Sequence, residues 1–562
     1  MSFDETGAPT TKPVMECAAL SLITLEMRRL ATLEGTVVDE DASPVPLAYV
    51  RLLTRVLIAG RQRWVAGPAA TTDDRGRYRF TNLPPGRYVV VVPFAQNTVP
   101  VPASVSAIEG VSDEQLARLD AQAVQRGAQP TRRVTRLLVQ GNTGLVAGRH
   151  ALPPPTDDGH PQAYPTMFYP GVRSVSQAEP VDLDSGLDRS GVDVTISPVP
   201  AARISGHVVA ASSVYGGMVL RLVPAGLEEL ADGSEAATAM VLPDGSFTFL
   251  NVPSGSYTLT APGSTSELQV RLPATQGGRR PVTLPDTPGI GRYGSGASGG
   301  LVSIAPDVMY HALTPQTLAD KHAGWVRIPL DVGGADIDNL TVPLTPSGSV
   351  RVQIVYEGLQ AAVPSGSIEL TPADGNPMSG VHTVYVDGNG VRNRLSEWME
   401  MPVVLPGEYA LRTIGMGDVT IKSIEVNGVD RSRDPLVVAG GQDARVVLTL
   451  TANVIRLSGF ISGDRGEHVP RASAIAFPTD KQLWSNYGFT PTWIRVSAGS
   501  SDGAFQLSNL RAGDYYLLGI DASRSSAWSD PAFLDAAVGR ATRLSLKWAD
   551  RRVTDAPLMV SK

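Results

Sequence analysis

One string in the sequence has the residue types of a serine nucleophile. Gly296-Ala297-Ser298-Gly299-Gly300 fits the Gly-x-Ser-x-Gly pattern. In hydrolases such a serine stands on a sharp turn between a strand and a helix, which exposes its hydroxyl for attack on a carbonyl. The flanking residues predict neither element, and the Gly-x-Gly-x-x-Gly strings between 289 and 299 lack the strand–helix–strand unit that binds phosphate. We therefore interpret 276–300 as a glycine-rich loop.

The seven histidines do not form a zinc-binding pattern. None stands in His-x-x-Glu, His-Glu-x-x-His or His-x-x-x-His, although catalytic zinc sites are commonly built from two such ligands on one element. Cys17 is the single cysteine, so an intramolecular disulfide is excluded and a cysteine-based zinc site lacks ligands. The sequence predicts no catalytic residue and no cofactor.

Calcium is the one cofactor that the sequence leaves open. Asp182, Asp184 and Asp188 lie close together, and Asp387 with Asn389 forms a second oxygen-rich loop. Clustered carboxylate and amide oxygens suit a hard cation. An EF-hand is excluded because the glycine that its loop needs at the sixth position is missing. Turn chemistry is a sufficient alternative explanation for the Asp-Gly pairs.

Aromatic side chains give the one indication of ligand binding. Trp484, Tyr487 and Trp493 lie close together in a stretch interrupted by Asn, Gly and Pro, and Tyr164 and Tyr169 form a second group. Flat rings on a loop or a sheet face can stack on the apolar face of a sugar. The alternative is that the rings cover the edge of a domain or pack in a contact between domains. Both interpretations stay open from the sequence.

The elements around these residues follow one repeated pattern of turns and strands. Each copy has an Asp-Gly-type turn, a short alternating strand, a turn often containing Pro, and then Gly-x-Tyr. Ten positions separate the turn glycine from the glycine of Gly-x-Tyr in three copies, and seventeen in the third copy. The four pairs are Gly76 and Gly86, Gly245 and Gly255, Gly390 and Gly407, and Gly503 and Gly513. A fixed spacing of this kind indicates one repeated structural unit.

The residue types of this unit predict antiparallel β-structure. Asp-Gly supplies the positive φ angles that tight hairpins need. Tyr78 and Phe80, like Phe247 and Phe249, alternate with polar residues, so one face of that strand is expected to be buried. The 56 glycines and 44 prolines among the 562 residues also indicate many turns. We expect an all-β fold of about four tandem antiparallel β-sandwiches, prealbumin-like or immunoglobulin-like, with one short helical insertion.

The spacing of the copies sets the expected domain boundaries. The units are an N-terminal tail at 1–30, a first sandwich with an insertion at 31–201, a second at 202–346, a degenerate third at 347–453 and a fourth at 454–562. Residues 112–127 predict the inserted helix, because Ser112 can cap it and apolar residues recur at helical spacing. A second short helix is expected near Ala532–Ala541.

Charge and hydropathy exclude several classes of partner. The net charge is −7 and no run of Lys or Arg is longer than two, so a nucleic-acid partner is not expected. No stretch of 18 apolar residues exists, so no membrane-spanning helix is expected. The apolar stretch from Cys17 to Leu25 follows Glu16 and has no cationic segment before it, so it is no clear signal peptide.

The first copy, TTDDRGRYRFTNLPPGRYVV, resembles the carboxypeptidase regulatory-like domain along its whole turn–strand–turn–strand core. The second and fourth copies resemble it less closely, and the third only weakly. The whole chain is similar to large bacterial proteins built from several such domains. The resemblance implies a prealbumin-like, carbohydrate-binding-like sandwich and a secreted, periplasmic or cell-surface setting. It does not imply peptidase chemistry, because in zinc carboxypeptidases this domain is an accessory to a separate catalytic domain.

Repetition of a turn-built sandwich without a catalytic motif predicts a non-catalytic, rod-like scaffold or adhesive protein of the cell envelope or exterior. The expected partner is a glycan or a protein surface. The alternative is an accessory or regulatory module of an envelope enzyme or transporter assembly.

Overall fold

The computed structural model describes most of the chain as β-structure. The described residues are 29–100, 137–140, 143–146, 152–209, 218–230, 234–242, 244–261, 267–270, 282–285, 301–305, 308–311, 324–358, 365–376, 379, 381–386, 398–470, 472–521 and 527–559. Their strands form pairs of facing sheets, and each pair encloses its own apolar core. The predicted all-β sandwich fold is confirmed.

Sandwich 1 is built around two long, buried strands of the first repeat. Its strands are β1 (Ala31–Val38), β2 (Tyr49–Ile58), β3 (Arg61–Thr71), β4 (Arg77–Leu83), β5 (Gly86–Val92), β10 (Met167–Phe168), β11 (Val181–Leu183), β12 (Asp188–Arg189) and β13 (Val194–Thr195). One sheet has the order β12-β1-β13 with β4 also on β1, and the other has the order β10-β5-β2-β3 with β11 also on β5. Buried residues alternate along β4, as its sequence predicts.

Sandwich 2 also recruits strands that the sequence assigns to the insertion of sandwich 1. Its strands are β6 (Gln96–Pro100), β7 (Leu137–Gln140), β8 (Thr143–Val146), β9 (Gln162–Ala163), β14 (Val199–Val209), β15 (Val219–Pro224), β16 (Ala237–Met240), β17 (Ser246–Pro253), β18 (Gly255–Ala261), β23 (Gly324–Val332), β24 (Ile337–Pro343) and β25 (Thr345–Pro346). The sheets have the orders β17-β14-β24 (with β9 on β14) and β25-β23-β18-β15-β16-β6-β8-β7.

The placement of β6 corrects the expected boundary of the insertion. This strand follows β5 of sandwich 1 but pairs with β16 in parallel, with Asn97 opposite Thr238. The Thr238 hydroxyl donates to Asn97 Oδ1 at 2.8 Å, and the Leu250 N–H donates to Thr98 Oγ1 at 2.9 Å. Side-chain hydrogen bonds therefore add to the ladder that holds the insertion on the second sandwich. The helix predicted at 112–127 lies outside the described residues.

A separate four-stranded sheet lies within the second unit of the chain. Its strands are β19 (Glu267–Val270), β20 (Val282–Pro285), β21 (Leu301–Ala305) and β22 (Val308–His311), in the order β20-β19-β22-β21. Strand β20 falls inside 276–300, which the sequence predicts to be a loop, so that prediction is wrong for these four residues. Residues 296–300, with the Gly-x-Ser-x-Gly string, lie outside the described residues.

Sandwich 3 has a five-stranded and a four-stranded sheet. Its strands are β26 (Gly348–Glu357), β27 (Gly366–Pro372), β28 (His382–Val386), β29 (Met399–Val404), β30 (Gly407–Ile414), β31 (Thr420–Val426), β32 (Val429–Asp430), β33 (Leu436–Val438) and β34 (Asp443–Thr451). The orders are β29-β26-β34-β31-β32 and β28-β27-β30-β33. The core between the sheets contains residues of both, such as Val352 and Leu370.

Sandwich 4 adds short helices to the same plan. Its elements are β35 (Ile455–Ser462), β36 (Ser473–Pro478), η4 (Lys481–Trp484), β37 (Arg495–Ala498), β38 (Ala504–Leu510), β39 (Gly513–Ile520), η6 (Ala527–Ser529), α3 (Pro531–Ala537), η7 (Val538–Arg540), β40 (Thr542–Leu546), β41 (Arg551–Val553) and β42 (Ala556–Pro557). The sheets are β38-β35-β41, with β42 on β35, and β37-β36-β39-β40. The helix predicted near Ala532–Ala541 is confirmed: Asp530 caps α3 through the Ala532 N–H.

Each sandwich contains a parallel pair of strands, although the sequence predicts antiparallel sheets. The first strand of each repeat pairs in parallel with a later strand of the same sandwich: β1 with β13, β14 with β24, β26 with β34, and β35 with β41. Such pairs join residues far apart in sequence, so no local turn signal marks them. The other pairings within these sheets are antiparallel, apart from the second parallel partners of β1 and β35 and the parallel pair of β6 with β16.

The repeated turns have the backbone geometry that the sequence predicts. Gly76, Gly245 and Gly503 have φ angles of 71°, 85° and 83°, in the left-handed region that favours glycine. The repeat also contains a feature missed in the sequence, an Asn four residues before each Gly-x-Tyr in copies one, two and four. Asn82, Asn251 and Asn509 have φ angles of 59°, 57° and 58°. The strand register shifts at each of these positions, so the Asn marks a β-bulge.

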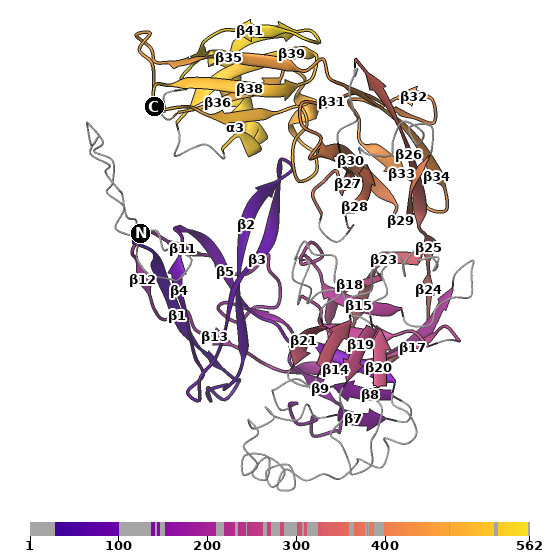
Figure 1. The fold of residues 1–562 in the computed structure, drawn as a ribbon. Coiled ribbons are helices and arrows are strands. Elements are labelled where there is room, and N and C mark those ends of the chain that lie inside the picture. Colours follow the sequence, from indigo (N-terminus) through magenta and orange to yellow (C-terminus); the bar gives the residue numbers. More distant parts are fainter. Residues whose placement is uncertain are drawn as a thin grey trace, which may run out of the picture.

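The four sandwiches form a closed arrangement instead of the predicted rod. The β2–β3 hairpin of sandwich 1 projects beyond its sheet to α3 of sandwich 4 (Figure 1). Its two-residue tip, Ala59-Gly60, has positive φ at both positions, as a type I′ turn requires. The Asn486 N–H of sandwich 4 donates to Ala59 O at 3.0 Å. The rod prediction is wrong because this hairpin joins the first unit to the last.

Candidate functional site

Two of the predicted aromatic ligand-binding residues are buried in the contact between sandwiches 1 and 4. Trp484 is 2% exposed and Tyr487 is 9% exposed, in an apolar cluster that includes Ala59 of the hairpin tip. The Trp484 indole N–H donates to Pro478 O at 2.8 Å, and its ring packs edge-on against Phe477. The structure therefore favours the packing interpretation for these two rings over a sugar platform.

The other three predicted rings are half-buried and also pack inside the protein. Tyr164 and Tyr169 lie against the core of sandwich 1, and Tyr164 contacts Phe94 with ring centroids 5.4 Å apart. The Trp493 ring carries the Arg511 guanidinium 4.6 Å from its centroid and the Arg433 guanidinium at 5.7 Å. The structure thus does not bring the five rings together, but it places Trp493 beside a group of arginines.

That group lines a cavity of about 460 Å³ between sandwiches 3 and 4. Strands β30 and β31 form one wall, and the other consists of the loop at 490–497 with β37 and β38. Three arginines and many hydroxyl and amide side chains lie among its lining residues, and no acidic residue does. The three arginines are Arg412, Arg495 and Arg511. Concave sites of about 300–1,000 Å³ are typical of small-molecule binding.

Arg511 links the two walls of this cavity. Its guanidinium, 3% exposed, donates through Nε to Ile421 O and through Nη1 to Ser432 O of sandwich 3, each at 3.0 Å. Its Nη2 is buried without a hydrogen-bond partner. Burial lowers the pKa of Arg511 to about 10, and the Arg495 charge acts in the same direction. Arg511 is thus a fixed cation with one free donor nitrogen.

The neighbouring arginines differ in how their charges are compensated. Arg412 donates through Nε and Nη2 to Glu369 Oε2 at 2.9 and 2.6 Å, and through Nη1 to Thr490 Oγ1 at 2.6 Å. Arg495 donates through Nη1 to Pro491 O at 2.7 Å, and burial lowers its pKa. Among the described residues, no carboxylate forms an ion pair with Arg495 or Arg511. The cavity therefore holds net positive charge in a partly desolvated place.

Two more polar groups next to the arginines lack partners. Asn509 lines the cavity, and its Oδ1 is buried without a hydrogen-bond donor. The Tyr515 hydroxyl is also buried without a partner. Burial raises the pKa of Tyr515 to about 12, and the Arg511 and Arg495 charges limit that rise. Unsatisfied buried polar groups are uncommon in native proteins, and a bound ligand is one way to satisfy them.

These arginines were not predicted from the sequence, although the repeat contains a signal for one of them. Arg511 stands four residues before the tyrosine of the fourth copy, where the first two copies have Pro84 and Pro253. The third copy has Leu405 at this position, so Arg511 is the one charged residue among the four copies. No sequence signal relates Arg511 to Arg412, because the two come from different sandwiches.

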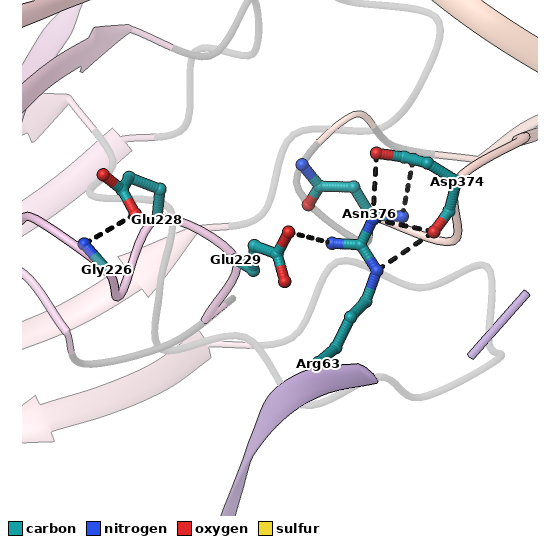
Figure 2. Close-up of polar contacts among 6 residues, drawn as sticks. All are labelled: Arg63, Gly226, Glu228, Glu229, Asp374 and Asn376. Carbon is teal, nitrogen blue, oxygen red and sulfur yellow. Dashed lines mark hydrogen bonds and ion pairs between the residues drawn. The ribbon is translucent and has the colours of Figure 1, made fainter. Parts of the chain in front are cut away.

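In a second contact between sandwiches, a buried arginine is paired with two carboxylates (Figure 2). Arg63 of β3, 3% exposed, lies 2.7 Å through Nη1 from Glu229 Oε1 of sandwich 2. Its Nη2 lies 2.9 Å from Asp374 Oδ2 of sandwich 3, and Nε and Nη2 both donate to Asp374 O. Asp374 also accepts from the Asn376 N–H. This junction joins three sandwiches through one hairpin side chain.

The calcium candidates at the end of sandwich 1 form other contacts. Arg87 donates through Nε and Nη2 to the two carboxylate oxygens of Asp182 at 2.7 and 2.9 Å, and Asp188 pairs with Arg29. Asp387 and Asn389 lie outside the described residues. In the described part of the chain, no group of three or more His, Cys, Asp or Glu is placed to hold a metal ion. Nor does any helix there have the length and apolarity needed to cross a bilayer.

Solved structures with weak similarity to this chain include a protein of Bacillus anthracis and two pilus proteins of streptococci. The TIE protein of Bacillus anthracis is 8% identical, with 91% of this chain and 68% of that chain covered and a TM-score of 0.15. The minor pilin GBS52 of Streptococcus agalactiae is 10% identical over 55% of this chain and 94% of that chain (TM-score 0.16). The pilus backbone RrgB of Streptococcus pneumoniae is 10% identical over 47% and 81% (TM-score 0.13). Likeness at this level carries no argument about this chain.

Sequence comparison is more specific for the first repeat. No curated protein matches the chain. Residues 32–114 match the family model of the carboxypeptidase regulatory-like domain, which confirms the resemblance predicted from the first copy of the repeat.

Proposed function

We propose that this chain is a non-catalytic binding scaffold of the cell envelope or exterior, and that it takes its ligand in the cavity between sandwiches 3 and 4. The observation that carries the proposal is this cavity, with fixed walls and buried polar groups that lack partners. A glycan or a segment of a protein surface is the expected ligand. Function has to be argued from a site and not from the fold, and this cavity is the site on which the proposal rests.

The closed arrangement supports the proposal because it keeps the cavity walls in place. Sandwich 4 is held by Arg511 from one side and by the hairpin tip of sandwich 1 from the other. A Cβ on Gly60 would lie 2.9 Å from Ser485 Cβ, and one on Gly375 would lie 2.5 Å from Ile58 Cγ2, so both contacts are close. Preorganised walls lower the entropic cost of binding.

An array of glycans and extracellular proteins tests this proposal with a cavity-filling variant. Ser497→Trp places a large ring in the cavity, and Thr81→Trp places the same ring at an exposed position of β4 as a matched control. We expect at least one ligand on the array to bind the Thr81→Trp variant but not the Ser497→Trp variant. The thermal midpoints of both variants should equal that of the wild type. Retention that is equal in both variants would contradict a binding role for the cavity.

The alternative of an accessory module is favoured by one exposed edge of sandwich 3. Tyr385 is 83% exposed on the edge strand β28, and Val381 and Trp398 nearby are 39% and 42% exposed. Exposed aromatic residues at the free edge of a sheet are typical of protein contacts. A stable complex with an envelope enzyme that Tyr385→Ser disrupts, and Ser497→Trp does not, would support this alternative.

A further inference from the structure

We infer that the cavity between sandwiches 3 and 4 binds a sugar that carries a carboxylate. This inference rests on the proposed function, since it names the ligand class for the same cavity. Two kinds of group that line this cavity support the inference. Within the part of the chain that the structure describes, the guanidiniums of Arg495 and Arg511 have no carboxylate partner, and the amide oxygen of Asn509 has no hydrogen-bond donor.

The carboxylate is specified by Arg511 and Arg495. Arg412 already holds Glu369, so its charge is compensated within sandwich 3. Asp430 is close enough to act on Arg511 through its charge, but its carboxylate accepts from the Ser432 N–H and hydroxyl instead. The free Nη2 of Arg511 can donate to an anion, and charge-assisted bonds of this kind are about twice as strong as neutral ones.

The hydroxyls of the ligand are specified by the other lining residues. Asn509 Oδ1 needs a donor that a carboxylate cannot supply, whereas a sugar hydroxyl can. Thr413, Thr492, Ser497 and Ser508 line the same cavity, and each hydroxyl can both donate and accept. An acidic peptide would satisfy the guanidiniums, but its carboxylates and amides offer no row of hydroxyl donors. A neutral sugar would leave the arginine charges unpaired.

Calorimetric titration of the full chain with three matched probes tests the inference. The probes are tri-galacturonate, the neutral α-1,4-linked galactotriose of the same length, and tri-glutamate. We expect tri-galacturonate to bind at least about tenfold more tightly than either of the others. Its affinity should fall as salt increases, because the cavity is only partly enclosed.

Two variants assign this binding to the cavity. Arg495→Gln removes one uncompensated charge, and Asn509→Asp places a negative charge at the orphan acceptor while keeping a residue type that tolerates positive φ. Each should weaken tri-galacturonate binding at least about tenfold, whereas Arg87→Gln, on the exposed surface of sandwich 1, should leave it unchanged. Using both variants keeps the test valid if one of them folds poorly.

Equal affinity for the neutral trisaccharide, preference for tri-glutamate, absence of tri-galacturonate binding, or full affinity in both variants would each overturn the inference. None of these results contradicts the proposed function by itself. The proposed function fails only if Ser497→Trp abolishes the binding of no ligand on the array. The two failures are therefore distinguishable.

Discussion

The second and fourth copies of the repeat differ at one hydrogen bond, and the difference shows how a structural turn becomes part of a cavity. In the second copy the Tyr257 hydroxyl donates to Pro253 O, four residues earlier, at 2.7 Å. The first and third copies make the same bond, from Tyr88 to Pro84 O and from Tyr409 to Leu405 O. In the fourth copy Tyr515 makes no such bond and lies beside Arg511.

The comparison separates two uses of one backbone framework. The Gly-x-Tyr corner stabilises its sandwich where the tyrosine satisfies a buried carbonyl. In the fourth copy Arg511 replaces the proline, and its guanidinium ties sandwich 4 to sandwich 3 through two carbonyls. The Tyr515 hydroxyl is left without a partner beside the proposed binding cavity. It does not form the stabilising bond that the tyrosines of the other copies donate to the carbonyl four residues earlier.

Removal of Arg511 should have the largest effect among the predictions that follow from this comparison. Arg511→Met leaves Ile421 O and Ser432 O without their donor, and we expect the free energy of unfolding to fall by about 2–4 kcal/mol. Chemical denaturation followed by Trp fluorescence measures this change. Pro253→Met at the equivalent position of the second copy is the control and should cost far less. Equal losses would show that Arg511 is no more than a turn residue.

The third copy should show an acid-sensitive stability, because its tyrosine packs against a partly buried histidine. Burial lowers the pKa of His382 to about 4, and its ring contacts Tyr409 edge-on. The unfolded chain binds the proton near its usual pKa of about 6.5, so stability is fully present above that pH and falls between 6.5 and 4. The expected loss is on the order of 2–3 kcal/mol.

Denaturation of the wild type and of His382→Gln across this range of pH measures the histidine contribution. The variant should lose the slope between pH 6.5 and 4 that the wild type shows. A wild-type slope that persists unchanged in the variant would assign the acid sensitivity to carboxylates instead.

Paired removal of the two tyrosine hydroxyls tests the comparison itself. Tyr257→Phe leaves the Pro253 carbonyl without its donor and should cost about 1–1.5 kcal/mol. Tyr515→Phe removes a buried hydroxyl that has no partner, so stability should stay unchanged or rise slightly. Thermal unfolding of both variants gives the two values. A cost for Tyr515→Phe that equals the cost for Tyr257→Phe would mean that the fourth corner is not different.

The smallest effect is expected at the bulge asparagines. Asn251→Gly and Asn509→Gly both keep a residue that tolerates positive φ, so each should change the free energy of unfolding by no more than about 0.5 kcal/mol. Only Asn509→Gly should weaken binding of a cavity ligand, because it removes the orphan Oδ1. Equal binding by both variants would exclude Asn509 from the site.

The sequence predicted the fold within each sandwich because its signals are local. Asp-Gly turns, the alternation of Phe247 and Phe249, and the Gly-x-Tyr spacing each involve residues close together in the chain, and the structure has these elements. The parallel pairing of β1 with β13 and the transfer of β6 to sandwich 2 join distant segments, so no turn signal reveals them.

The candidate site was beyond sequence reasoning for the same physical reason. Trp484 and Tyr487 looked accessible in a loop with Asn, Gly and Pro, but the Ala59-Gly60 tip, which lies more than 400 residues earlier in the chain, packs against them. Arg412, Arg495 and Arg511 share a cavity only because sandwiches 3 and 4 meet there. Contacts between domains depend on relative placement, which a repeat pattern does not encode.

Both the closed arrangement and the fixed cavity walls depend on sandwich 4 being held against the hairpin of sandwich 1. Spin labels at Gln62→Cys and Gln482→Cys, two exposed positions beside this contact, allow a direct distance measurement in a Cys17→Ser background. If this contact holds, the full chain should show one short and narrow distance distribution. A long or broad distribution, as four sandwiches strung out in a rod would produce, would contradict it.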